Sequence, residues 1–143
     1  MNIYRTLVAV LVSMAVNVTA WAQIGTLSAQ EVENLLDAIA TVETGGESDP
    51  DNAVGDGGKA LGAFQIWRPY WIDAVERRPD LKQQGYTSVK NRAYARDIVK
   101  AYWKRYAPKN ATAQDLARIH NGGPSGHRKA STQKYWSKVR KHL

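Results

Sequence analysis

Glu43 is the residue of this chain whose position best suits proton-transfer chemistry. It is the last charged residue of an amphipathic helical pattern, directly before Thr44 and a loop rich in Gly and Asp. A carboxyl group at the buried end of a helix can stay protonated near neutral pH, because burial raises the pKa of a carboxyl group. Acid-assisted cleavage of a glycosidic bond requires such a group. The alternative interpretation is a carboxylate on the solvent face of the helix.

Cleavage of a glycosidic bond usually also needs a second carboxylate, which stabilises or attacks the positive sugar centre or activates water. The loop after the helix offers four acidic candidates: Glu47, Asp49, Asp51 and Asp56. We favour Asp56, because a hairpin would bring its arm of the loop back across a cleft towards Glu43. A plain turn residue is the alternative, since Asp before Gly is common in turns.

Four further residues are candidates for the substrate-binding part of the cleft. Gln65 could bond the N-acetyl group of a sugar or fix the hairpin by a structural hydrogen bond. Tyr70 and Trp71 could stack on sugar rings, but adjacent helical positions point different ways, so one of the two belongs to the core. His120 is a candidate cleft residue, whereas Asn121, just before two glycines, could equally be a helix cap.

The sequence predicts neither a metal site nor a cofactor. His120 has no Cys, Asp or second His at metal-ligand spacing. The chain carries no phosphate-binding loop, nucleotide fingerprint or Gly-x-Ser-x-Gly motif. It also contains no Cys, which excludes thiol chemistry and leaves the core to hold the domain together without disulfides.

Helices are expected to provide most of the framework for these residues. A capping-box pattern begins at Ser28, apolar residues follow at helical spacing, and Gly45-Gly46 ends the first helix. The stretch 44–62 predicts a small, irregular β-hairpin. Further helices are expected from Pro69 to about Glu76, from about Ser88 to Tyr106, from Thr112 through Ile119, and from Thr132 to Lys141. The class is therefore mainly helical, with one small β element.

The first 22 residues have the pattern of a secretory signal peptide. Arg5 precedes the apolar run Leu7 to Val16, and Ala20-Trp21-Ala22 is a small-x-small cleavage pattern. The apolar run is shorter than the about 20 residues that span a bilayer, so we expect no stable membrane insertion after cleavage. We therefore predict a signal peptide over 1–22, a domain over 23–143, and export to the periplasm or beyond the cell.

The remaining domain is basic. Removal of the signal peptide, with Arg5 as its one charged residue, would lower the formal net charge from +7 to +6. An exported basic protein favours anionic cell-wall polymer or anionic lipid as its partner. We expect no nucleic-acid partner, because export separates the protein from nucleic acid.

Several blocks of the sequence resemble the lysozyme and lytic-transglycosylase superfamily, whose pattern is a catalytic Glu, Ser or Thr, Gly, a loop and Gly-x-x-Gln-Ile. The matching blocks are Val42 to Gly46, Asn52 to Asp56 and Ala60 to Ile66. Three others are similar to invertebrate-type (destabilase-like) lysozymes: Pro69 to Asp73, Ala117 to Gly126 and Ser131 to Trp136. The resemblance extends from about Leu35 to Val139.

This resemblance implies an α+β, lysozyme-like fold, mainly helical, with a small β-hairpin beside the active-site cleft. It also implies a peptidoglycan muramidase that hydrolyses the β-1,4 bond between N-acetylmuramic acid and N-acetylglucosamine. By motif match, Glu43 is the proton donor. Asp56 is the nearest match to the family's second carboxylate, with its spacing shifted by one residue.

The sequence departs from the family pattern at its cysteines and at one lysine. Invertebrate-type lysozymes are rich in disulfides, whereas this chain has other residues at those positions: Gly46, Leu61, Ala74 and His127. This suggests a disulfide-independent, bacterial relative. Some family members are credited with isopeptidase activity that involves a Lys just after Gln-Ile, but Trp67 occupies that position here, so we do not extend that activity to this chain.

Two alternative functions stay open at this point. A lytic transglycosylase would need Glu43 alone and would release anhydro-sugars without using water. A non-catalytic peptidoglycan-binding protein would keep the fold without the chemistry.

Overall fold

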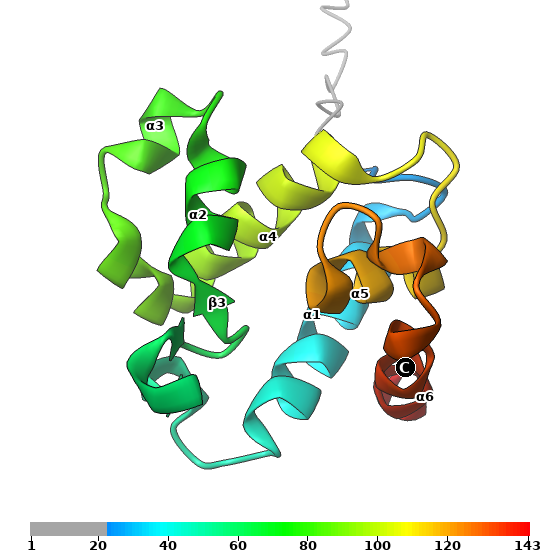
Figure 1. Cartoon of the computed structure of the whole chain (residues 1–143), viewed down its shortest axis with the longest axis horizontal. Helices are drawn as coiled ribbons and strands as arrows, with labels where there is room; N and C mark the ends of the chain where they lie inside the picture. Colours follow the sequence, from blue (N-terminus) through cyan, green and yellow to red (C-terminus); the bar gives the residue numbers. More distant parts are fainter. Residues whose placement is uncertain (1–22) are drawn as a thin grey trace, which may run out of the picture.

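The computed structural model describes residues 23–143, so the expected signal peptide lies outside the described residues. Within them, the chain forms six α-helices and a three-stranded sheet (Figure 1). Helices α1, α5 and α6 lie on one side of the view, and α2, α3 and the sheet lie on the other, with α4 running from behind α2 towards the middle. In the described part of the chain, no helix is both long and apolar enough to cross a membrane.

Helix α1 (Ala29–Thr44) has the ends that the sequence predicts. The Ser28 hydroxyl accepts the backbone N–H of Glu31, and the Glu31 carboxylate accepts the backbone N–H of Ser28 at 2.7 Å. The helix ends at Gly45, which has a left-handed φ of 62° and so suits a residue without Cβ. One face is buried, and Glu43 lies in the last turn, where the chain leaves the core.

The predicted hairpin is present as part of a small antiparallel sheet. Its strands are β1 (Val54–Gly55), β2 (Ala60–Leu61) and β3 (Ile66–Trp67), in the order β1-β2-β3. Leu61 pairs with both Val54 and Ile66. The third strand was not predicted, because two residues between a turn and Pro69 are too few for an alternating pattern.

The remaining helices are α2 (Arg68–Val75), α3 (Pro79–Lys82), α4 (Arg92–Tyr106), α5 (Ala113–Gly122) and α6 (Gln133–Val139). The prediction that α4 begins near Ser88 was wrong, because a 3-10 segment covers Tyr86–Lys90. Asn91 then caps α4, its Oδ1 accepting the N–H of Tyr94 at 3.0 Å, which is the usual helix-starting role of Asn. Helix α3 was not predicted, since one turn is too short for helical periodicity.

The core lies between α1, α4 and α5. Its largest fully buried side chains include Trp103, Phe64, Leu35, Ile98 and Ile119. An ionic cluster also joins α1 to α4, because Arg96 pairs with Glu33 and Asp37. These contacts fix the helix that carries Glu43 against the rest of the molecule.

Candidate active site

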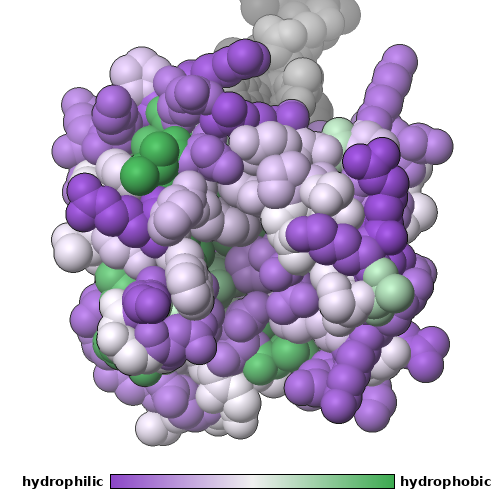
Figure 2. All heavy atoms as spheres, in the orientation of Figure 1, coloured by the Kyte–Doolittle hydropathy of each residue, from purple (hydrophilic) through white to green (hydrophobic). Residues whose placement is uncertain are grey.

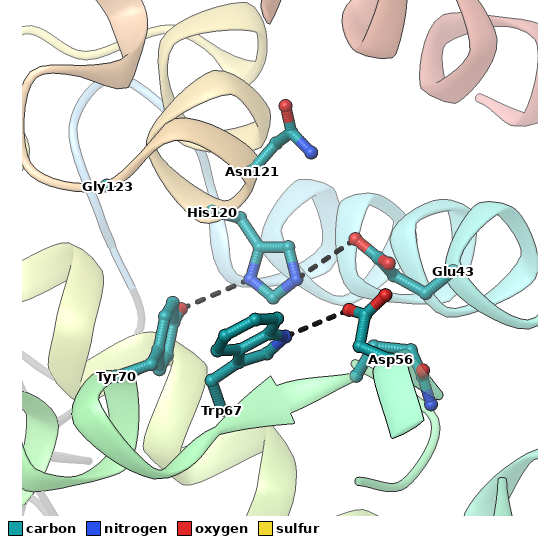
Figure 3. Close-up of a pocket in the computed structure, with 8 residues that line it drawn as sticks. Glu43, Asp56, Trp67, Tyr70, His120, Asn121 and Gly123 are labelled. Atoms are coloured by element: carbon teal, nitrogen blue, oxygen red, sulfur yellow. Dashed lines mark hydrogen bonds and ion pairs between the residues drawn. The ribbon is translucent and has the colours of Figure 1, made fainter. Parts of the chain in front are cut away.

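A hollow of about 370 Å³ brings together all six residues that the sequence suggested for the site. It is lined by Glu43, Asp56, Gln65, Trp67, Tyr70, His120, Asn121 and Gly123. Figure 2 shows that this face of the molecule is hollowed near its centre and largely hydrophilic around the hollow. The lining residues come from α1, the sheet, α2 and α5, so the cleft exists only when these elements are packed together (Figure 3).

Glu43 is partly buried and is held from two directions. Its side chain is 19% exposed, and its Oε1 atom accepts a hydrogen bond from the Tyr135 hydroxyl at 2.7 Å. The Nε2 atom of His120 lies 3.5 Å from the same oxygen. Glu43 is therefore not a freely solvated helix-surface carboxylate, the alternative that its sequence position had left open.

The hydrogen bonds of His120 define which of its ring nitrogens carries a proton. Nε2 lies 3.1 Å from the carbonyl oxygen of Phe64, which can only accept, so Nε2 must be protonated. Nδ1 lies 3.1 Å from the Tyr70 hydroxyl, which can donate to a neutral ring. Both ring nitrogens of His120 thus have a partner, and the Nε2–H side of the ring is turned towards Glu43 (Figure 3).

The two tyrosines around Glu43 and His120 keep their hydroxyl protons. Burial, with Tyr102 and the Glu43 carboxylate as further causes, raises the pKa of Tyr70 well above its ordinary value. Burial also raises the pKa of Tyr135, reinforced by the charge of Glu43 and by its hydrogen bond to that carboxylate. A phenol with a raised pKa stays a hydrogen-bond donor across the physiological range. Tyr135 therefore donates to Glu43 rather than competing with it for a proton.

Asp56 is exposed at the opposite wall of the cleft (Figure 3). Its Oδ2 atom accepts a hydrogen bond from Trp67 Nε1 at 3.1 Å. Its φ of 48° is left-handed, which is uncommon for a residue other than Gly. Asp56 thus takes part in the turn between β1 and β2 and also presents its carboxylate to the cleft.

The other acidic residues of the loop do not line the cleft. Asp51 forms a salt bridge with Arg92 at 2.5 Å. Asp49 accepts hydrogen bonds from the side chain of Asn52. Asp56 is therefore the loop carboxylate that the fold places across from Glu43.

Gln65 is engaged in fixing the hairpin, one of its two predicted roles. Its Nε2 atom donates to the carbonyl oxygen of Gly62 at 3.0 Å. Its Oε1 atom lies against Gly55, where an added Cβ would be only 2.1 Å away. Gly55 therefore makes room for the Gln65 side chain, which also lines the cleft.

The structure separates the neighbouring aromatics Tyr70 and Trp71. Trp71 is buried and donates from Nε1 to the Tyr94 hydroxyl at 2.8 Å, so it is the core member of the pair. Tyr70 lines the cleft, and its ring stacks on Tyr102 with centroids 3.7 Å apart and planes 12° apart.

Asn121 lines the cleft, one of its two predicted roles, and does not cap the helix. Helix α5 continues through Gly122, and the backbone N–H of Gly123 closes it on the carbonyl oxygen of Ile119. Asn121 is exposed and lines the cleft within the last turn of the helix. Gly122 retains helical geometry, so the cap is Gly123, two residues beyond Asn121.

Sequence reasoning missed two residues that hold the proposed carboxylates. Tyr135 had no predicted role of its own, and Trp67 was noted only as a replacement for Lys. Tyr135 lies 92 residues from Glu43 along the chain, so no local pattern could pair them. The resemblance of the Ser131 to Trp136 block to the lysozyme family was the one signal that this segment belongs near the site.

Comparison with known proteins identifies relatives over most of the chain. The sequence model of the Destabilase family matches residues 32–142. An invertebrate-type lysozyme of Ruditapes philippinarum is 32% identical over 114 residues, which cover 76% of this chain and 79% of the relative. Lysozyme 1 of Crassostrea virginica is 39% identical over 83 residues, covering 56% of this chain and 43% of the relative. A lysozyme of Magallana gigas is 40% identical over 85 residues, which cover 56% of this chain and 58% of the relative. The chain thus matches about half the length of these last two relatives.

Solved structures share the fold. A crystal structure of Tapes japonica lysozyme has a TM-score of 0.62 and 32% identity, covering 76% of this chain and 88% of the other. A crystal structure of Aeromonas hydrophila PliI in complex with Meretrix lusoria lysozyme gives a TM-score of 0.60 with the same identity and coverage. The predicted fold class, mainly helical with a small antiparallel sheet beside the cleft, is confirmed.

Proposed function

The chain belongs to the Destabilase family, and from this premise we propose that it is a lysozyme-type glycoside hydrolase acting on peptidoglycan. The bond cleaved is the β-1,4 linkage between N-acetylmuramic acid and N-acetylglucosamine. The observation that carries the proposal is the placement of two carboxyl groups in one cleft. Glu43 is partly buried and hydrogen-bonded, whereas Asp56 is exposed on the opposite wall.

In this mechanism Glu43 protonates the oxygen of the leaving sugar. Because Oε1 accepts the hydrogen bond of Tyr135, the transferable proton of a neutral Glu43 is carried by Oε2. Tyr135 therefore fixes both the orientation of the carboxyl group and the oxygen from which the proton leaves. General acid catalysis of this kind contributes typically 10²–10⁴-fold in rate.

Asp56 supports the positive charge that develops on the sugar as the bond breaks. Its exposure and its hydrogen bond from Trp67 suit a carboxylate that can face an oxocarbenium-like centre. In this proposal the two carboxyl groups therefore have different roles, with Glu43 as the acid and Asp56 as the stabilising carboxylate.

The test is digestion of purified peptidoglycan by the protein and by its Glu43→Gln variant, with mass spectrometry of the released fragments. We expect muropeptides with a reducing end from the wild type and a loss of at least about 10²-fold in rate in the variant. Circular dichroism of both proteins verifies that the fold is retained. Wild-type turnover by Glu43→Gln would refute the role of Glu43.

The nature of the fragments separates the proposal from its alternatives. Anhydro-muropeptides, together with a small effect of Asp56→Asn, would identify a lytic transglycosylase. Tight binding by a folded protein that releases no fragments would identify a non-catalytic wall-binding protein.

A further inference from the structure

A second hollow shares the side chain of Trp67 with the cleft. It has a volume of about 430 Å³ and is lined by Gly58, Lys59, Trp67, Arg68, Pro69 and Tyr86. We call it the Trp67 groove. Because Trp67 lines both hollows, a substrate in the cleft and a group in the groove would contact the same indole.

The walls of the Trp67 groove are held in place. The Trp67 ring is 42% exposed, yet its Nε1 atom is bound to Asp56 and the Lys59 ammonium lies 5.8 Å from the ring centroid. The Tyr86 hydroxyl lies 2.8 Å from the carbonyl oxygen of Ile66 and 3.1 Å from that of Lys59. This hydroxyl joins β3 to the residue that precedes β2, so the groove has a defined shape before any ligand arrives.

The groove carries positive charge that the protein itself does not neutralise. Within residues 23–143, Lys59 and Arg68 form no salt bridge with a carboxylate. Arg92 and Arg96, in contrast, are paired with acidic side chains. Asp56 is bound to Trp67 Nε1 and lines the cleft rather than the groove. Two unpaired cations beside an exposed aromatic ring favour a ligand that is anionic and partly apolar.

We propose that the Trp67 groove binds the acidic peptide stem of the glycan strand whose sugar rings lie in the cleft. This inference rests on the proposed function, because the stem is attached to the muramic acid ring next to the bond that is cleaved. A stem must leave the cleft beside that ring, and the groove adjoins the cleft through Trp67. The carboxylates of the stem match Lys59 and Arg68, and its small apolar side chains match Trp67 and Pro69. The preferred substrate is therefore a glycan that carries peptides rather than a bare glycan.

Binding affinity tests this inference without depending on turnover. Glycan fragments from walls free of phosphate-bearing polymers are prepared in two forms, with their stems and with the stems removed by an amidase. The dissociation constants of both forms are measured by calorimetry with the Glu43→Gln variant, which does not consume them. We expect the peptide-bearing form to bind more tightly.

In the groove variant, Lys59→Gln and Arg68→Gln are added to the Glu43→Gln protein. The preference for the peptide-bearing form should then fall by about threefold to tenfold, the range expected for the loss of two exposed ion pairs. A control with Lys109→Gln and Arg140→Gln removes the same charge at exposed positions outside both hollows and should retain the preference. Rising salt should also weaken the preference in the Glu43→Gln variant itself. This second measurement needs no change to the groove and so does not depend on how the groove variant folds.

An equal preference in the groove variant and the control would overturn the inference, as would a preference seen only with phosphate-bearing walls. Cleavage of stem-free glycan by the wild type tests the proposed function separately. If the wild type failed to cleave while the preference still depended on Lys59 and Arg68, the peptide-binding role of the groove would be supported and the proposed hydrolase function would be refuted.

Discussion

Glu43 owes its setting to Tyr135, a phenol from the far end of the chain. The Tyr135 hydroxyl donates to Glu43 Oε1 at 2.7 Å, and burial keeps the pKa of Tyr135 well above its ordinary value. The donor therefore stays in place whether the carboxyl group is neutral or charged. We interpret Tyr135 as a positioning residue for the proposed general acid.

Replacing Tyr135 with Phe should lower kcat by about tenfold, because the loss of one hydrogen bond to a carboxyl group is worth roughly 1–2 kcal/mol. KM should change less, since Tyr135 is not among the residues that line the cleft. Steady-state kinetics on soluble glycan fragments measures both constants.

Tyr106→Phe is the matched control for this experiment. Tyr106 also donates to a carboxylate, that of Asp73 at 3.1 Å, and lies outside the cleft. Equal losses of kcat in the two variants would indicate a general loss of stability rather than positioning of Glu43.

At the scale of elements, the sheet must approach the 3-10 segment Tyr86–Lys90 closely, and Gly62 permits this approach. Gly62 has a left-handed φ of 74°, and a Cβ there would lie 2.5 Å from the backbone oxygen of Val89. The backbone oxygen cannot rotate away, so the two segments would have to separate. The wall of the cleft that carries Asp56 would move with them.

We expect Gly62→Ala to lower the free energy of unfolding by about 2–4 kcal/mol, the sum of backbone strain and displaced packing. Gly46→Ala is a matched control, because Gly46 has a φ of 75° but nothing within 4 Å of an added Cβ. Its cost should be about 1 kcal/mol, from strain alone. Denaturant titration measures both, and equal losses would contradict the close approach at Gly62.

At the scale of the whole molecule, tyrosines join α2, α4 and α6 across the site. The pKa of Tyr102 is raised to about 12 by burial and by the nearby Asp73 and Tyr106. The pKa values of Tyr70 and Tyr135 are raised as well. In the unfolded chain these phenols ionise near pH 10. The folded protein therefore holds more protons than the unfolded chain above that pH.

The sign of this difference predicts an alkaline limit to stability. The contribution of the tyrosines is fully present below about pH 10 and is lost as the pH rises towards the folded pKa values. For Tyr102 the window runs from about pH 10 to about 12. Denaturant titrations across this range should show a falling free energy of unfolding, with a shallower fall in Tyr102→Phe. A free energy that stays constant up to pH 12 would contradict these raised pKa values.

Much of this architecture follows from local sequence. The first and fifth helices begin at the capping boxes of Ser28 and Thr112, because a cap needs only residues three positions apart. Glu43 could be singled out because it precedes two glycines at the end of an apolar helical face. The hairpin was predictable from its glycines, but its third strand was not, since two residues carry no periodicity.

What only the tertiary structure decided is which distant groups meet. The pairing of Glu43 with Tyr135, the bond between Trp67 and Asp56, and the contact of His120 with the carbonyl oxygen of Phe64 all depend on contacts between distant parts of the chain. Asn121 illustrates the same limit, because its sequence position allowed either a cleft residue or a helix cap, and the structure places it in the lining of the cleft with Gly123 as the cap. Local patterns are set by a few neighbouring residues. The partners of a side chain in a cleft are instead set by how whole helices pack, a property that belongs to the entire chain.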